Sequence, residues 1–224
     1  MIKKGFKDIM QGRILSGELK PGDKLPPERE LAAEMGISRG SVNQGLLDLE
    51  RMGFIRIVPR KGAYVADYMT GASPEILVAI MSYDTGLIGP DLFRDLMEMR
   101  ILVEKECAKL AAQKINAEAI RELYSISDRI HDAKGSELTA ALFEFHACVA
   151  RISGNKAYAL LFISFEKMIR RLIEVHYSSP EELRNTLPLY HELAQAISRG
   201  YAEEAQTLMG KILGSAASYL NQIL

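Results

Sequence analysis

The spacing of apolar residues in the first 66 positions predicts three helices followed by a short hairpin. The first helix has apolar residues one turn apart and ends before Gly17 and the turn signal Pro21-Gly22. Its apolar positions are Ile2, Phe6, Ile9, Met10 and Ile14.

The second and third helices are short and are separated by a glycine-serine break. Pro27 opens the second helix, and Gly36 follows its C-cap. Ser38 caps the third helix, which ends at Gly53. The expected inward residues are Leu31, Ala32 and Met35 on the second helix, and Val42, Leu46, Leu47 and Leu49 on the third.

After the third helix, the segments "FIRIV" and "GAYVA" alternate apolar and polar residues, and "PRKG" joins them. This pattern is typical of a β-hairpin. Two helices joined by a short glycine-containing turn form a helix-turn-helix, and a hairpin after the second helix makes it a winged one. An unspecialised helical hairpin with a small ribbon is the alternative, but the basic turn Arg60-Lys61 favours the winged form.

From about Glu75 onward the chain has helical patterns and no strand pattern. Short connections with turn or capping residues predict an antiparallel, up-and-down bundle. The expected helices span residues 75–87, 91–113, 117–133, 137–152, 156–178, 181–199 and 201–222, with Pro188 bending or splitting the sixth. The candidate N-caps are Asn116, Ser136, Asn155 and Ser179.

The fold class is therefore mainly α, with a winged helix-turn-helix at residues 1–67, a linker at 68–74 and an all-helical bundle at 75–224. The chain carries a net charge of −1, but residues 1–66 carry +4 and residues 67–224 carry −5. This asymmetry suggests that only the first domain meets a polyanion.

Composition favours a soluble, cytoplasmic protein. The chain is 48% hydrophobic and 25% charged, and it has neither a signal-peptide pattern at its start nor an apolar run that could span a bilayer. Its two cysteines, Cys107 and Cys148, lie in helical apolar patterns, where buried and reduced structural thiols are expected.

The stretch "SGELKPGDKLPPERELAAEMGISRGSVNQGLLDLERMGFIRIVPRKGAYV" resembles the DNA-binding domain of the GntR family of bacterial transcription regulators. The all-helical second domain resembles the effector domain of the FadR subgroup. Weaker similarity continues through "EMRILVE", "FEFHACVARISGNKAY", "VHYSSPE" and "YHELAQAISRGYAEEA". The last three segments are more similar to the fatty-acid-responsive branch than to the metal-binding branch.

The resemblance implies that the third helix enters the major groove of operator DNA N-terminus first. Backbone amides near Ser38 then approach phosphates, and Arg39 can contact guanine through two hydrogen bonds. Arg29 and the basic tip of the wing also reach DNA in the family. The expected DNA-binding residues are Arg29, Ser38, Arg39, Gly40, Ser41, Asn43, Arg60, Lys61 and Gly62.

Three positions of the third helix need separate explanations. Gly40 lies in the contact zone, where a larger residue would hold the duplex away, whereas Gly45 lies beyond it and is expected to permit tight helix packing. The family usually has arginine at the position of Asn43. Asparagine can read adenine through N6 and N7, or it can simply contact a phosphate or water.

The helical domain is expected to bind a small-molecule effector between its helices. Arg100 lies on an otherwise apolar stripe, so it needs an anionic partner, either a ligand or a neighbouring glutamate. His146, Tyr177 and His191 complete the expected effector-binding set. The resemblance implies an acyl-CoA, and an organic acid is the other candidate.

The metal-binding branch uses an Asp-x-x-x-His pair and two further histidines. Here Leu142 replaces the aspartate, His146 and His191 fit two histidines, and the third position falls on Ile212. Two imidazoles without a carboxylate form a poor divalent site, so neither a metal nor another cofactor is expected.

We therefore expect an effector-responsive, homodimeric regulator, a repressor of a metabolic operon that releases DNA when its effector binds. The chain lacks phosphate-loop and nucleophile-elbow motifs, which argues against an enzyme. A metal-dependent regulator of the same subgroup, a regulator with a mixed α/β effector domain and an all-helical enzyme are the alternatives.

Overall fold

The computed structural model describes residues 5–68, 70, 76 and 90–223. Contacts between Cα atoms divide the chain into two compact units, Met1–Gly89 and Pro90–Leu224. The expected helix at 75–87 and the expected linker at 68–74 lie almost entirely outside the described residues.

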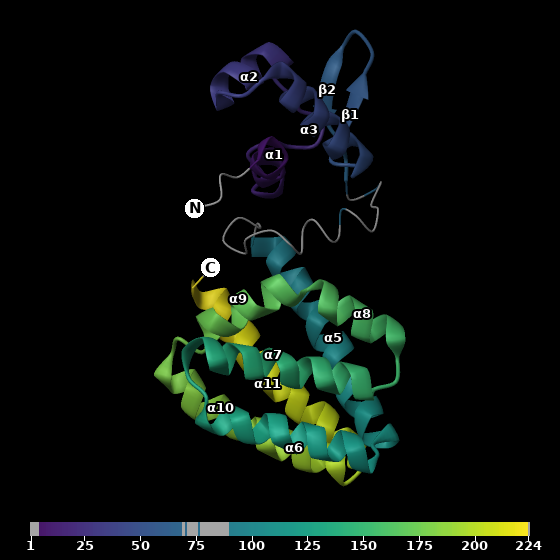
Figure 1. Cartoon of the computed structure of the whole chain (residues 1–224), viewed down its shortest axis with the longest axis vertical. Helices are drawn as coiled ribbons and strands as arrows, with labels where there is room; N and C mark the ends of the chain where they lie inside the picture. The colour runs from purple at the N-terminus through teal and green to yellow at the C-terminus, as the bar shows by residue number, and fades with distance from the viewer. Residues whose placement is uncertain (1–4, 69, 71–75, 77–89, 224) are drawn as a thin grey trace. The chain divides into compact units, whose positions relative to one another are not determined.

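The described residues of the first unit include three consecutive helices followed by a two-stranded antiparallel sheet (Figure 1). Its elements are α1 (Phe6–Leu15), α2 (Glu28–Met35), α3 (Arg39–Arg51), β1 (Ile55–Val58) and β2 (Gly62–Val65). The register pairs Ile55 with Val65 and Val58 with Gly62. The predicted winged helix-turn-helix architecture is confirmed.

Local signals set the boundaries of α2 and α3. Gly36 adopts a left-handed φ of 64° at the end of α2, a conformation that glycine reaches without steric cost. The Ser38 hydroxyl accepts a hydrogen bond from the Ser41 amide at 3.1 Å and so caps α3. The predicted Ser38 cap is confirmed, whereas Gly36, expected one residue after the C-cap, is itself the C-cap of α2.

The packing of α3 explains one glycine and corrects one leucine. A Cβ added to Gly45 would lie 2.3 Å from Cδ1 of Phe6, so Gly45 lets α1 approach α3 closely. Val42, Leu46 and Leu49 are buried as expected. Leu47 is 46% exposed, so its expected inward position is wrong, because it lies about 100° around the helix from Leu46.

The second unit is all-helical within the described residues (Figure 1). Its elements are α5 (Pro90–Lys114), α6 (Ala117–Asp132), α7 (Gly135–Ile152), α8 (Lys156–Ser164), α9 (Glu166–His176), α10 (Pro180–Ser198) and α11 (Ala202–Ile223). α5 packs mainly on α11, and α7 contacts α5, α6, α8 and α9. The predicted helical bundle is confirmed.

Two predicted helix boundaries in this bundle are wrong. The helix expected at 156–178 is two helices, because the buried residue Phe165, with φ −91° and ψ 2°, separates α8 from α9. Ser136 is not an N-cap, because α7 already begins at Gly135 after Lys134. Pro188 lies inside α10 without splitting it.

The other predicted features of the bundle agree with the structure. The side chains of Asn116, Asn155 and Ser179 each accept a backbone hydrogen bond at a helix start. Cys107 and Cys148 are buried free thiols, as expected. None of the helices among the described residues has the length and apolar character needed to cross a membrane.

Candidate functional site

The N-terminal end of α3 presents an exposed polar surface in the first unit. Its side chains come from the cap and the first two turns: Ser38, Arg39, Gly40, Ser41 and Asn43 are all exposed. No acidic residue lies in the first turn of α3, which the structure describes in full. The positive end of the helix dipole therefore faces solvent without a carboxylate from its own first turn to neutralise it.

Gly40 has no packing role inside the first unit. A Cβ added there would meet only Ser38 Oγ, at 3.8 Å, within the described part of the chain. Glycine in a helix costs about 1 kcal/mol relative to alanine, and internal contacts at Gly40 do not explain that cost. Gly40 and Gly45 therefore differ: the first faces outward and the second faces Phe6.

Four exposed cations near α3 and the wing make no ion pair with any described residue: Arg29, Arg39, Arg60 and Lys61. Two other arginines of the same unit are paired. Arg13 contacts Glu34 and Glu18, and Arg51 contacts Asp48 at 3.0 Å. The unpaired cations are thus available to an external anion.

The tip of the wing contains a strained backbone. Arg60 has a φ of 66°. Among the described residues, it is the only non-glycine residue with a positive φ. A left-handed conformation costs an L-residue about 1–2 kcal/mol. Gly62, two residues later, also has a positive φ, 108°, without that cost. A strained turn that carries an exposed cationic side chain is a candidate for a role of the Arg60 charge.

In the second unit, a buried ion pair connects α5 to α7. Arg100 Nε donates to Glu104 Oε1 at 2.5 Å, and the other carboxylate oxygen of Glu104 contacts His146 Nδ1 at 2.5 Å. Burial raises the pKa of Glu104, but the charges of Arg100 and His146 and their hydrogen bonds lower it to about 2. From the sequence, the anionic partner of Arg100 is expected to be a ligand or a neighbouring glutamate, and Glu104 is such a glutamate.

A chain of hydroxyl groups extends this pair toward α10. His146 Nε2 lies 3.0 Å from the Tyr190 hydroxyl, which accepts from the Tyr177 hydroxyl at 3.3 Å. Thr186 Oγ1 lies 3.1 Å from the Tyr177 hydroxyl. Burial raises the pKa of Tyr190 well above its usual value, so its hydroxyl keeps its proton.

A small cavity adjoins these groups. Its polar lining comes from Arg100, His146, His176, Tyr177 and Tyr190, and its apolar lining comes from Leu172, Ile173, Ile212, Leu213 and Ala216. The space open to the centre of a water-sized sphere is about 10 Å³, which suits about one water molecule. A second apolar cavity of about 20 Å³ lies beside Arg100 and Glu104, between α5, α8 and α9.

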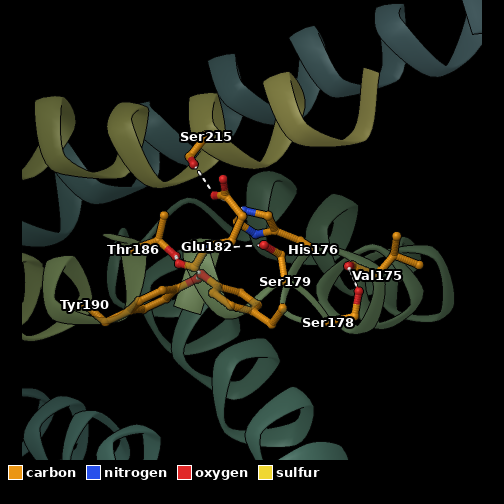
Figure 2. Close-up of polar contacts among 9 residues, drawn as sticks. Val175, His176, Ser178, Ser179, Glu182, Thr186, Tyr190 and Ser215 are labelled. Carbon is orange, nitrogen blue, oxygen red and sulfur yellow. Dashed lines mark hydrogen bonds and ion pairs between the residues drawn. The ribbon is translucent and has the colours of Figure 1, made fainter. Parts of the chain in front are cut away.

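A second polar cluster, drawn in Figure 2, shares His176 with the lining of this cavity. Glu182, in the first turn of α10, accepts from Ser215 of α11 at 2.5 Å and lies 2.7 Å from His176 Nε2 at the end of α9. Burial lowers the pKa of His176, although its contact with Glu182 opposes that shift. The cluster fixes three helix segments to one another.

The structure corrects the place of His191. It is exposed on α10, where Nδ1 lies 3.5 Å from Ser127 Oγ and Nε2 lies 2.9 Å from Gln195 Nε2. The expectation that His191 lines the cavity is wrong, because the preceding residue, Tyr190, faces inward and His191 lies about 100° around the helix.

This placement also bears on the metal-binding alternative. The two histidines that fitted the metal-binding pattern do not converge, since His146 is buried beside Tyr190 and His191 is exposed. Among the described residues, no three His, Cys, Asp or Glu side chains form a group that could hold a metal ion.

Of the expected effector residues, the structure brings together Arg100, His146 and Tyr177 and leaves out His191. Sequence reasoning missed Tyr190 and Thr186. Glu104 could have been assigned from its spacing of four residues from Arg100, which places the two on one helix face.

Both units match known protein families. Residues 95–215 match the FCD domain, and residues 5–65 match the bacterial regulatory proteins of the gntR family. These matches coincide with the bundle and the winged helix-turn-helix.

Several relatives are transcriptional regulators. The HTH-type transcriptional regulator LutR of Bacillus subtilis is 31% identical over 150 residues, 64% of each chain. An uncharacterized regulator of Mycobacterium tuberculosis is 30% identical over 66% of this chain and 60% of its own. The chain thus spans less than two thirds of these relatives. The fatty acid metabolism regulator protein of Klebsiella pneumoniae is 26% identical over 88% of this chain and 81% of its own.

Solved structures share the fold. The structure described as Lar, which controls the expression of the Listeria monocytogenes agr system, has a TM-score of 0.65 at 17% identity and covers 98% of this chain and 96% of that one. The E. coli McbR/YncC structure has a TM-score of 0.54 at 19% identity, covering 97% and 96%.

Proposed function

Because this chain belongs to the gntR family of bacterial regulatory proteins and carries an FCD domain, we propose that it is a repressor that binds operator DNA and releases it when an anionic effector binds its helical unit. The matched families and relatives are transcriptional regulators and not enzymes. The observation that carries the proposal is the exposed start of α3, which has no acidic residue in its own first turn, together with the four unpaired cations.

In this proposal α3 is the recognition helix. The amides near Ser38, Gly40 and Ser41 approach a phosphate, and Arg39 contacts a guanine through two hydrogen bonds. Arg29 supports the backbone contact from the start of α2. The wing residues Arg60, Lys61 and Gly62 lie at the neighbouring minor groove, and Asn43 contacts a base farther along α3.

A homodimer on a pseudo-palindromic site is part of the same proposal. One winged helix offers a small interface, and two-fold symmetry is the commonest way to double it. Light scattering of the full chain should give a dimer at the concentrations at which operator binding is measured. A monomer that keeps operator affinity contradicts this part.

The effector site is the cavity beside Arg100. Arg100 is only 7% exposed, and its single hydrogen bond to a described residue is the one from Nε to Glu104. A guanidinium has five N–H donors, so four remain for an acceptor in the cavity. A carboxylate or phosphate satisfies them best, because it accepts two parallel hydrogen bonds from arginine. Tyr177 and His146 supply further polar contacts on the cavity wall.

Effector binding must enlarge the cavity, because its volume of about 10 Å³ suits one water molecule and is too small for an organic acid. An incoming anion competes with the Glu104 carboxylate for Arg100, and both residues lie on α5. α5 is the described helix that follows the first unit in the chain, so its movement is the shortest covalent route to the DNA-binding unit. The effector changes DNA affinity only if it favours one arrangement of α5 over the other.

The chemical class proposed for the effector is an organic acid or an acyl-CoA. Similarity to a fatty acid metabolism regulator supports an acyl compound, and the apolar cavity on the other side of Arg100 supports an apolar tail. A thermal-shift screen of carboxylic acids and CoA esters, after native mass spectrometry of the purified protein, tests the proposal.

Stabilisation by one of these compounds should disappear in Arg100→Ala and persist in Arg94→Ala, a matched control. Arg94 is an exposed arginine of α5 that pairs with Asp91. If zinc alone stabilises the chain and His146→Ala abolishes this effect, the anionic effector is contradicted and the metal-dependent alternative is restored.

A further inference from the structure

Asn43, which the proposed function places against a base, also contacts a side chain of α2. Asn43 Nδ2 donates a hydrogen bond to Glu28 Oε1 at 3.1 Å. Glu28 is the first residue of α2, and Asn43 lies in the second turn of α3. Both side chains are exposed, so the contact does not arise from burial.

The contact determines which way the Asn43 amide points. A carboxylate can only accept hydrogen bonds, so the amide nitrogen must face Glu28 and Oδ1 must face away from it. Nδ2 carries two hydrogens, and Glu28 takes one of them. We take Glu28 to accept the hydrogen trans to Oδ1, which leaves the cis hydrogen and Oδ1 together on the free edge of the amide.

We propose that Glu28 is a positioning residue that holds the Asn43 amide in the orientation that selects adenine. The inference rests on the proposed function, because it requires α3 to lie in the major groove. Adenine presents the N7 acceptor and the N6 amino donor, which match the free N–H and Oδ1 of the fixed amide. Guanine presents acceptors at both N7 and O6, so Oδ1 would face another acceptor.

Without Glu28, the amide can rotate and direct Nδ2 toward O6 of guanine. Discrimination between adenine and guanine at this base pair should therefore fall when the acceptor is removed. The negative charge of Glu28 has a separate effect, since a carboxylate near DNA phosphates weakens binding to every sequence.

Two substitutions separate orientation from charge. Glu28→Gln removes the charge and keeps a side-chain oxygen that can accept from Asn43 Nδ2. Glu28→Ala removes both. We expect both variants to bind all DNA sequences more tightly than the unmodified chain and by a similar factor, whereas only Glu28→Ala changes base preference.

The experiment uses the full chain. Binding sites are first selected from randomised duplex DNA, and Kd values are then measured at fixed salt for the selected site and its single-base variants. The unmodified chain and Glu28→Gln should prefer adenine over guanine at one base pair of each half-site by about tenfold or more. Glu28→Ala should lower this ratio below about threefold and leave the other positions unchanged. Asn43→Ala should lose the same adenine preference. The double variant Asn43→Ala, Glu28→Ala should show the same adenine-to-guanine ratio as Asn43→Ala alone.

The outcomes distinguish the inference from the function on which it rests. If the unmodified chain selects no sequence and its binding lacks specificity, the proposed operator recognition fails. If it selects a site but Glu28→Ala keeps the adenine preference, or Glu28→Gln loses it equally, then Glu28 has no positioning role. Equal thermal unfolding of the three chains confirms that α2 and α3 are intact.

Discussion

Replacing Gly45 by alanine should destabilise the first unit, although alanine favours helices. Alanine in a helix gains about 1 kcal/mol over glycine. Here the new Cβ would lie 2.3 Å from Cδ1 and 3.1 Å from Cε1 of Phe6, whose side chain is 8% exposed. The ring must move within a packed interface, and overpacking of this kind costs about 1–3 kcal/mol. Since a 2.3 Å approach belongs at the upper end of that range, we expect a net loss of about 1–2 kcal/mol.

Gly40→Ala is the matched control on the same helix. Its Cβ would meet only Ser38 Oγ at 3.8 Å, so the substitution should be neutral or stabilise the unit by up to about 1 kcal/mol. The functional effects should be reversed. Gly40→Ala should weaken operator binding because its methyl group lies at the proposed phosphate contact, whereas Gly45→Ala should keep operator affinity wherever the unit is folded.

Hydrogen exchange of peptides from α1 and α3 in the full chain measures the stability of this unit separately from the bundle. Protection in these peptides should fall in Gly45→Ala and be kept or increased in Gly40→Ala. Adding Phe6→Leu to Gly45→Ala should cost less than Phe6→Leu costs alone, because the smaller side chain relieves the clash. A Gly45→Ala chain at least as protected as the unmodified one would refute the packing argument.

Three further substitutions or treatments have defined outcomes. Arg39→Ala should lower DNA affinity and relax the preference at one base pair by about 1–3 kcal/mol. Lys61→Ala should weaken binding to all DNA sequences alike and reduce the slope of log affinity against log salt concentration by about one. DNA titrations at several salt concentrations distinguish the two variants. Because the pKa of Glu104 is lowered to about 2, its stabilisation of about 3 kcal/mol is present above pH 4.5 and is lost as the pH falls toward 2. Thermal unfolding from pH 7 to 2 should show this loss, and Glu104→Gln should lack it. Burial raises the pKa of Cys107 and Cys148 to about 11, so iodoacetamide should label both thiols only after unfolding; rapid labelling of the folded chain contradicts their burial.

Much of the fold could be predicted from the sequence because its signals are local. The Ser38 cap, the Gly36 terminus and the alternation of the wing each depend on residues within one turn or one hairpin. The exposed polar start of α3 followed from these boundaries. The Arg100 stripe likewise predicted a buried arginine, which the structure confirms.

The tertiary structure decided which side chains meet. Periodicity alone did not distinguish Tyr190 from His191, because adjacent helical residues differ by about 100° and the packing of α10 selects the inward one. The break at Phe165, the partnership of Gly45 with Phe6 and the contact between Asn43 and Glu28 also join or orient separate helices. Such contacts depend on the relative position of two elements, which the local sequence of either element does not specify.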